Sequence, residues 1–119
     1  MASFDEELRK AFQELQAKVI TTTAQVKVAE AQIIQLKRSI QHAQLTEYEV
    51  TQLPEETKAY ESVGRMFILR STKEVKRNLE NRVKHAEDKI KGIEANKEYL
   101  QKSVKEQENS IREMLQQRV

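Results

Sequence analysis

The chain has no cysteine and no tryptophan, and among its 119 residues only two are glycine and one is proline. Without cysteine it can form neither a disulfide framework nor a cysteine-ligated metal site, which fits a reducing compartment. Because glycine and proline break helices, their scarcity favours long uninterrupted helices over a compact mixed fold. Three Tyr and three Phe leave little material for a large globular interior.

Two further absences bear on location and partners. No apolar run approaches the roughly 20 residues that a membrane-spanning helix needs, and the acidic N-terminus lacks the apolar core of a secretory signal. The 21 basic and 19 acidic residues are interleaved, whereas a nucleic-acid-binding surface gathers Lys and Arg on one face. We therefore expect a cytoplasmic protein that binds neither membrane nor nucleic acid.

Residues with catalytic or cofactor-binding chemistry are also missing from any recognisable arrangement. There is no glycine-rich phosphate loop and no setting for a nucleophile. His42 and His85 fall in different predicted helices, without carboxylates at ligand spacing, so we interpret both as solvated helix residues rather than metal ligands. The sequence predicts a protein that is not an enzyme and uses no metal or cofactor.

What the chain does contain is a heptad repeat in each half. From about residue 3 to 44, core-type residues recur at alternating spacings of four and three, the pattern of a coiled-coil helix. Ser3 is the predicted N-cap of this helix. Its seam consists of Leu8, Phe12, Leu15, Val19, Thr22, Val26, Ala29, Ile33, Leu36, Ile40 and Ala43.

A second helix is predicted from about residue 72 to 118, after Ser71 and Glu74 at capping-box spacing. Its seam consists of Leu79, Val83, Ala86, Ile90, Ile93, Lys97, Leu100, Val104, Gln107, Ile111 and Met114. Two seams of equal length predict an antiparallel coiled coil with both termini at one end. In the favoured register, Thr22 faces Lys97, so that polar residues share a layer.

The segment between the helices divides into two predicted parts. Residues 46–53 are expected to form a short helical elbow, because Thr46 and Glu49 have capping-box spacing and Pro54 forces Leu53 out of helical geometry. Residues 58–70 predict a β-hairpin around Gly64, which can adopt the positive φ of a tight turn. The fold class is thus dominated by α-helix, with a single hairpin at the turn of the coiled coil.

This hairpin is too apolar to remain alone in water, where a two-stranded hairpin is marginal in any case. No other segment of the chain predicts a strand, so we expect the partner strands to come from other subunits. The residues assigned to subunit assembly are Tyr60, Val63, Gly64, Met66, Phe67, Ile68 and Leu69.

Several stretches resemble β-type subunits of the prefoldin family. They are residues 10–20 (KAFQELQAKVI), 60–69 (YESVGRMFIL), 103–106 (SVKE) and 111–115 (IREML). The resemblance implies a heterohexamer of α-type and β-type subunits, whose hairpins form a β-barrel platform from which coiled coils project. It also implies an ATP-independent holdase that binds unfolded actin and tubulin and transfers them to the cytosolic chaperonin.

The free ends of the helices are the predicted client-binding site. Gln107 interrupts the apolar seam there, while Phe4, Leu115 and Val119 are apolar and lie off the seam. The alternative is that the seam residues at these ends are ordinary core and the ends merely fray. The residues assigned to client binding are Phe4, Leu8, Phe12, Ile111, Met114 and Leu115.

Two alternatives stay open at this stage. The basic residues Arg70, Lys73, Lys76 and Arg77 either face a partner or form a solvated surface beside the platform. The chain as a whole could also be a structural coiled-coil adaptor without chaperone activity. The apolar side chains of the hairpin favour the chaperone subunit, because an adaptor could reverse direction with a polar loop.

Overall fold

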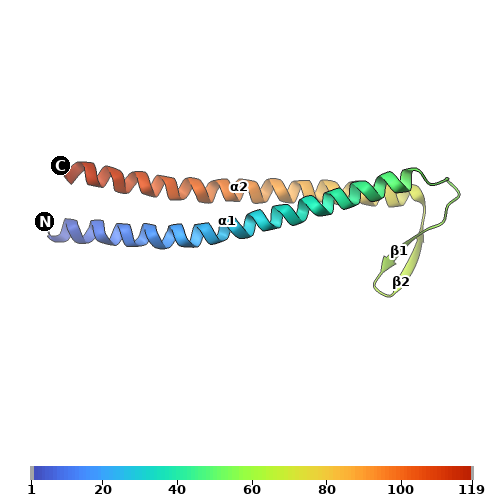
Figure 1. The fold of residues 1–119 in the computed structure, drawn as a ribbon, viewed down its shortest axis with the longest axis horizontal. Helices are drawn as coiled ribbons and strands as arrows, with labels where there is room; N and C mark the ends of the chain where they lie inside the picture. Colours follow the sequence, from blue (N-terminus) through green and yellow to red (C-terminus); the bar gives the residue numbers. More distant parts are fainter. Residues whose placement is uncertain (1, 119) are drawn as a thin grey trace. The chain divides into compact units, whose positions relative to one another are not determined.

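The structure, a computed structural model, describes residues 2–118. Helix α1 (Ala2–Thr51) is followed by strands β1 (Ala59–Val63) and β2 (Met66–Arg70) and by helix α2 (Thr72–Arg118) (Figure 1). The chain divides into two units, Met1–Gln32 with Gly92–Val119, and Ile33–Lys91. We call the first the terminal unit and the second the hairpin unit; each helix contributes to both.

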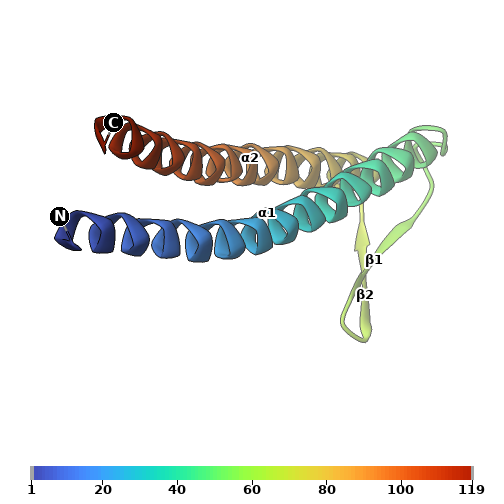
Figure 2. The same ribbon diagram turned by 60° about the vertical axis from the view of Figure 1, so that its left-hand side comes forward.

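In the terminal unit, α1 and α2 run antiparallel, and their described ends lie at the same end of the unit (Figures 1 and 2). Burial follows the predicted heptads: Leu8, Thr22, Ala29 and Ile111 are buried. The other seam residues of this unit are half-buried, except Phe12, which is 45% exposed. The predicted N-cap is wrong, because α1 begins at Ala2 and Ser3 lies inside it.

The register of the terminal unit differs from the predicted one. Thr22 lines a common pocket with Gln101 and Val104, about one turn further along α2 than Lys97. Lys97 instead places its Nζ atom 3.2 Å from Oε1 of Glu30. Heptads repeat identically along a helix, so the spacing by itself does not select the register. The length of the lysine side chain lets it pair with a carboxylate beside the seam rather than with a hydroxyl facing it.

The hairpin unit continues the seam with buried Ile33, Ala43 and Ala86. Here α1 extends to Thr51, so the predicted helix end near residue 44 and the separate elbow at 46–53 are wrong. The four-three spacing continues from Ala43 to Glu47 and Val50, both half-buried. A glutamate at this seam position interrupts the apolar pattern in the sequence, although the helix itself continues.

The side chain of Thr46 confirms that this part of α1 is helix interior. Its Oγ1 donates a 2.9 Å hydrogen bond to the carbonyl oxygen of His42, four residues earlier, so Thr46 is not the predicted cap. The helix then tightens, with 3.3 Å and 3.2 Å bonds from the Gln52 and Leu53 amides to the Glu49 and Val50 carbonyls. It ends just ahead of Pro54, as the effect of proline on its preceding residue predicts.

The two strands form an antiparallel hairpin in which Val63 pairs with Met66 and Ala59 with Arg70. Gly64 has a φ of 61°, whereas no non-glycine residue of the described chain has a positive φ. A two-residue loop with positive φ only at its first position corresponds to a type II′ turn, whose twist matches that of the strands. The predicted hairpin and the role of Gly64 are therefore confirmed.

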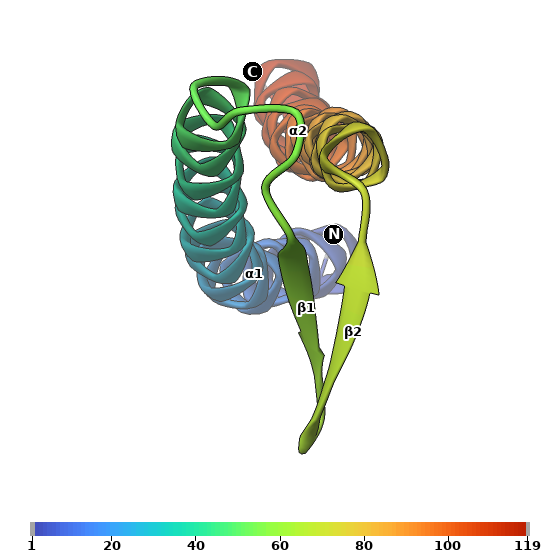
Figure 3. The same ribbon diagram turned by 90° about the vertical axis from the view of Figure 1, so that its right-hand side faces the viewer.

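Ser71 separates the hairpin from α2 and caps the helix. Its Oγ accepts a 3.2 Å hydrogen bond from the amide of Glu74, and its carbonyl oxygen accepts a 3.0 Å bond from the amide of Val75. The first contact satisfies the Glu74 amide, which has no partner within the helix, and the second is the first backbone hydrogen bond of α2. In the hairpin unit, β1 and β2 project sideways from the paired ends of the helices (Figures 1 and 3).

Candidate assembly and client-contact surfaces

The hairpin has two faces, because side chains alternate along each strand. One face carries Tyr60, Ser62, Phe67 and Leu69; the other carries Ala59, Glu61, Val63, Met66, Ile68 and Arg70. The faces differ in exposure. Phe67 is 72% exposed on the first face. On the second, Met66 is 63% exposed near the turn, whereas Ala59, Glu61, Ile68 and Arg70 are half-buried. The structure thus brings all the residues assigned to assembly into one ribbon, and this chain leaves their apolar side chains exposed except for half-buried Ile68.

The hairpin also has two open edges, since its sheet contains only β1 and β2. The pair that closes a two-residue turn is hydrogen-bonded, and bonded pairs alternate with non-bonded pairs along an antiparallel ladder. Counting from Val63 and Met66, the non-bonded pairs are Tyr60 with Leu69 and Ser62 with Phe67. The backbone N–H and C=O groups of these residues therefore point outward, where a further strand can bind them.

Arg70 joins the hairpin to the first turn of α2. Its Nε donates to Oε2 of Glu61 at 2.5 Å, and its Nη1 lies 3.8 Å from Oε2 of Glu74. All three side chains are partly exposed, so these ion pairs orient the ribbon more than they stabilise it.

At the free ends of the helices, the residues assigned to client binding differ in exposure. Leu8 and Ile111 are only 6% and 4% exposed, so both belong to the seam in this conformation. Phe12 and Leu115 are exposed, at 45% and 39%, and Phe4 and Met114 are half-buried. Val119, the remaining off-seam apolar residue, lies outside the described residues.

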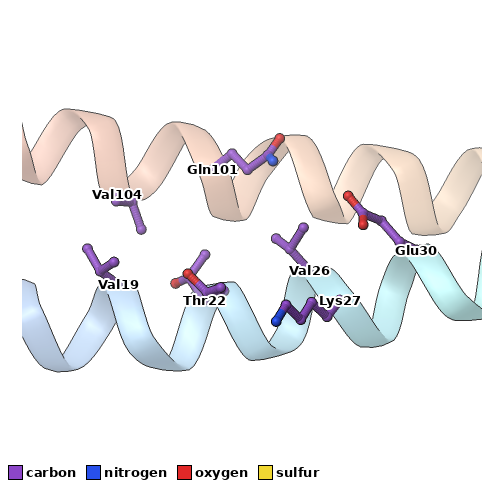
Figure 4. A pocket seen from close by; sticks show the side chains of 8 residues that line it. Val19, Thr22, Val26, Lys27, Glu30, Gln101 and Val104 are labelled. Carbon is purple, nitrogen blue, oxygen red and sulfur yellow. The ribbon is translucent and has the colours of Figure 1, made fainter.

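Further along the terminal unit, the seam is loosely packed around a pocket of about 400 Å³. Val19, Thr22 and Val26 from α1 and Val104 from α2 point into it (Figure 4). Close to the pocket, Nζ of Lys18 donates a 2.7 Å hydrogen bond to Oγ of Ser103. This section of the helix pair is held by short side chains and polar contacts rather than by large aliphatic residues.

The structure reveals one feature that sequence reasoning missed, a groove of about 380 Å³ between β1 and the adjoining ends of α1 and α2. Val50, Val75 and Leu79 give it an apolar lining, to which Asn78 and Arg82 add polar groups. No local pattern signals this groove, because it depends on how closely the hairpin approaches the helices.

The other residues singled out in the sequence, the two histidines and the basic residues near the start of α2, form no metal site with the described residues. His42 and His85 are exposed, and the described residues contain no group of three or more His, Cys, Asp or Glu able to hold a metal. Across residues 2–118, no helix has the length and apolar character to span a membrane. In the basic string, Arg70 pairs with two glutamates, whereas Lys73, Lys76 and Arg77 form no ion pair with a described residue.

Comparison with known proteins gives the same family along nearly the whole chain. The profile described as "Prefoldin subunit" matches residues 13–118. The chain is 54% identical to prefoldin subunit 1 of Homo sapiens over 117 residues, covering 98% of this chain and 96% of that protein. It is 39% identical to prefoldin subunit 1 of Arabidopsis thaliana, covering 95% of this chain and 88% of that protein.

The fold has a solved counterpart in the crystal structure of the prefoldin beta subunit from Thermococcus strain KS-1. The two superpose with a TM-score of 0.72 at 16% identity, over 90% of each chain. At that identity the match concerns the fold alone, two long helices joined by a hairpin. Taken with the sequence matches, it leads to one conclusion: this chain belongs to the prefoldin subunit family and is a prefoldin chaperone subunit.

Proposed function

We propose that the chain is a β-type subunit of a heterohexameric, ATP-independent holdase of the cytoplasm. In this proposal its hairpin completes a platform with α-type and β-type subunits. Its helix ends bind unfolded actin and tubulin, which the assembly transfers to the cytosolic chaperonin. No catalytic step is required, because binding apolar segments of a client is sufficient to keep them from aggregating.

The observation that carries the proposal is the exposure of the hairpin, above all of Phe67 at 72%. A contiguous apolar ribbon with two open edges is an aggregation hazard unless other strands cover it. Neighbouring subunits of the same family supply such strands. The apolar surface of each face is then removed from water. This burial stabilises the assembly by roughly 25 cal/mol per Å² of apolar area.

Client contact at the free helix ends divides into two classes of residue. Phe12 and Leu115 are exposed and can contact an apolar segment directly. Leu8 and Ile111 are buried in the seam and become available only when the two helices separate there. Met114 is half-buried, and its flexible, polarisable side chain suits irregular partners.

A capture assay with the reconstituted assembly tests the client site. We expect the double variant Phe12→Ser, Leu115→Ser to assemble normally but to suppress the aggregation of denatured actin less well than the parent. The matched control is Ile20→Ser, an equally apolar and 66% exposed position of α1 away from the helix ends.

Full suppression by the double variant would refute the placement of the client site. If the parent assembly suppressed no aggregation at all, a structural adaptor would replace the chaperone proposal.

A further inference from the structure

The pocket in the seam of the terminal unit is lined mainly by branched apolar side chains. Val19 and Val26 of α1 and Val104 of α2 point into it (Figure 4). Its volume of about 400 Å³ is typical of ligand sites, which are mostly apolar with a few convergent polar groups. A void of this kind deprives the seam of contacts that longer aliphatic side chains would restore, so packing alone does not account for the pocket.

Thr22 adds a hydroxyl to this apolar lining. It is 7% exposed and is the one buried polar residue of the described chain. A threonine hydroxyl inside a helix can bond to the carbonyl four residues earlier, as Thr46 does with His42 and Thr51 with Glu47. Thr22 forms no hydrogen bond with a described residue, and it lines the pocket. Because every fully enclosed side-chain N or O atom of residues 2–118 has a partner, this hydroxyl stays accessible from the pocket as an unused donor and acceptor.

This combination matches a side chain with an apolar body and a polar tip. A phenylalanine side chain would fill the apolar part and displace solvent from the Thr22 hydroxyl without replacing its hydrogen bonds. A tyrosine side chain instead places its ring against the valines and its phenolic O–H beside that hydroxyl. At the rim, Thr23, Lys27 and Gln101 are exposed and form no hydrogen bond or ion pair with described residues, so they can bind the backbone on either side of the tyrosine.

The position of the pocket favours a client over another subunit as the source of this side chain. The residues assigned to assembly all belong to the hairpin unit, whereas the pocket and the residues assigned to client binding belong to the terminal unit. Phe12, which is 45% exposed, occupies the seam of α1 two turns before Val19. At about 1.5 Å per residue the two are roughly 10 Å apart along the helix, a distance that about three extended residues span. A segment bound at the helix ends therefore reaches the pocket along the seam.

We propose that this pocket is a client-binding subsite that takes a tyrosine side chain of an unfolded segment and hydrogen-bonds its hydroxyl to Thr22. The inference rests on the proposed client-binding function. It adds to that function a contact region away from the helix ends and a preference among the side chains of the client. Burial against the valines supplies affinity, and the hydroxyl of Thr22 supplies selectivity.

Site-specific cross-linking locates the contact. A photoreactive benzophenone side chain replaces Thr23 at the rim of the pocket or, as the matched control, Ala24, which is exposed on α1 but does not line the pocket. Each variant is reconstituted with partner subunits and given denatured actin. We expect cross-links to actin from position 23 and not from position 24. Equal cross-linking from both positions, none from either, or cross-links from position 23 to a partner subunit would refute a client as the occupant.

The side-chain preference is tested with Thr22→Val, which replaces the hydroxyl by a methyl group at nearly the same shape. The probes are two unstructured peptides that differ only in having one tyrosine or one phenylalanine. We expect the parent assembly to bind the tyrosine peptide about fivefold more tightly and Thr22→Val to bind both equally. Lys97→Leu, which alters the seam without lining the pocket, should keep the preference.

Two results of the peptide assay would overturn the role of Thr22. Equal affinity of the parent assembly for both peptides would refute the preference for tyrosine. A change in both affinities by the same factor in Thr22→Val would show that Thr22 only packs in the seam.

Failure of this inference is separable from failure of the proposed function. If Phe12→Ser, Leu115→Ser loses capture of denatured actin while the pocket yields neither cross-links nor a preference, clients bind at the helix ends alone. If the parent assembly captures no denatured actin, the proposed function fails and the subsite with it.

Discussion

Lys97 occupies a seam position of α2, yet its Nζ lies 3.2 Å from Oε1 of Glu30, and the two side chains remain 28% and 52% exposed. An ion pair with this degree of solvent contact contributes less than about 1 kcal/mol to stability. The alkyl part of Lys97 covers the seam, and its charge reaches water. The pair therefore fixes which residues face one another at little gain in free energy.

Replacing this lysine by an apolar residue should strengthen the helix pair. In Lys97→Leu the seam gains a buried aliphatic side chain and loses only a weak ion pair, so we expect stabilisation of about 1 kcal/mol. The measurement is hydrogen exchange of the terminal unit within the reconstituted assembly, where amide exchange should slow about fivefold. Glu30→Gln is the control, since it removes the ion pair alone and should change exchange only slightly. Faster exchange in Lys97→Leu would contradict the weak contribution assigned to the pair.

Gly92 offers a second stabilising substitution. It lies inside α2, and a Cβ added there meets nothing within 4 Å. Gly92→Ala should therefore stabilise the helix by about 1 kcal/mol, because alanine has less backbone freedom to lose on folding. Hydrogen exchange of peptides that span residue 92 should slow about fivefold, with peptides from the hairpin as the internal control.

The same substitution at Gly64 should have the opposite effect, although a Cβ there also meets nothing within 4 Å. The backbone φ of +61° is the deciding difference, since a side chain costs about 1–2 kcal/mol in left-handed geometry. We expect Gly64→Ala to weaken entry into the assembly about tenfold, measured by competition with the parent chain. Unchanged incorporation would mean that the turn does not need its present geometry for assembly.

Phe67→Glu tests the platform directly. Burying a carboxylate without a partner costs several kcal/mol, so we expect loss of incorporation while circular dichroism shows unchanged helix content. Tyr99→Glu is the control, because Tyr99 is 68% exposed on α2 and is equally large. If both variants incorporated equally well, the hairpin would not be the assembly surface.

Much of this fold could be predicted because its signals are local and repeated. Heptad spacing located both helices, Ser71 marked the start of α2, and Gly64 marked the turn. The end of α1 was missed because Glu47 fills a seam position that the pattern reserves for apolar residues. The register was missed because every heptad offers an equivalent alignment, and the reach of Lys97 to Glu30 is a property of side-chain length rather than of spacing.

The candidate surfaces were predictable to different degrees. The hairpin residues stand out as an apolar cluster around a glycine, so sequence alone could assign them to assembly. The division of the helix-end residues into buried Leu8 and exposed Phe12 has no signal in the sequence, because both occupy seam positions in the heptad pattern. Arg82 carries no signal in the sequence, where it is one of many charged helix residues; only the approach of β1 places it beside a groove.

The open edges of the ribbon also bear on how the subunit must be produced. A copy made in excess of its partners keeps Phe67 and Met66 in water, together with unbonded backbone groups on both strands. Water solvates those groups in an orphan copy, but the open edges also allow such copies to pair with one another in unproductive stacks. The ribbon therefore favours matched synthesis of all subunits, or prompt degradation of the surplus.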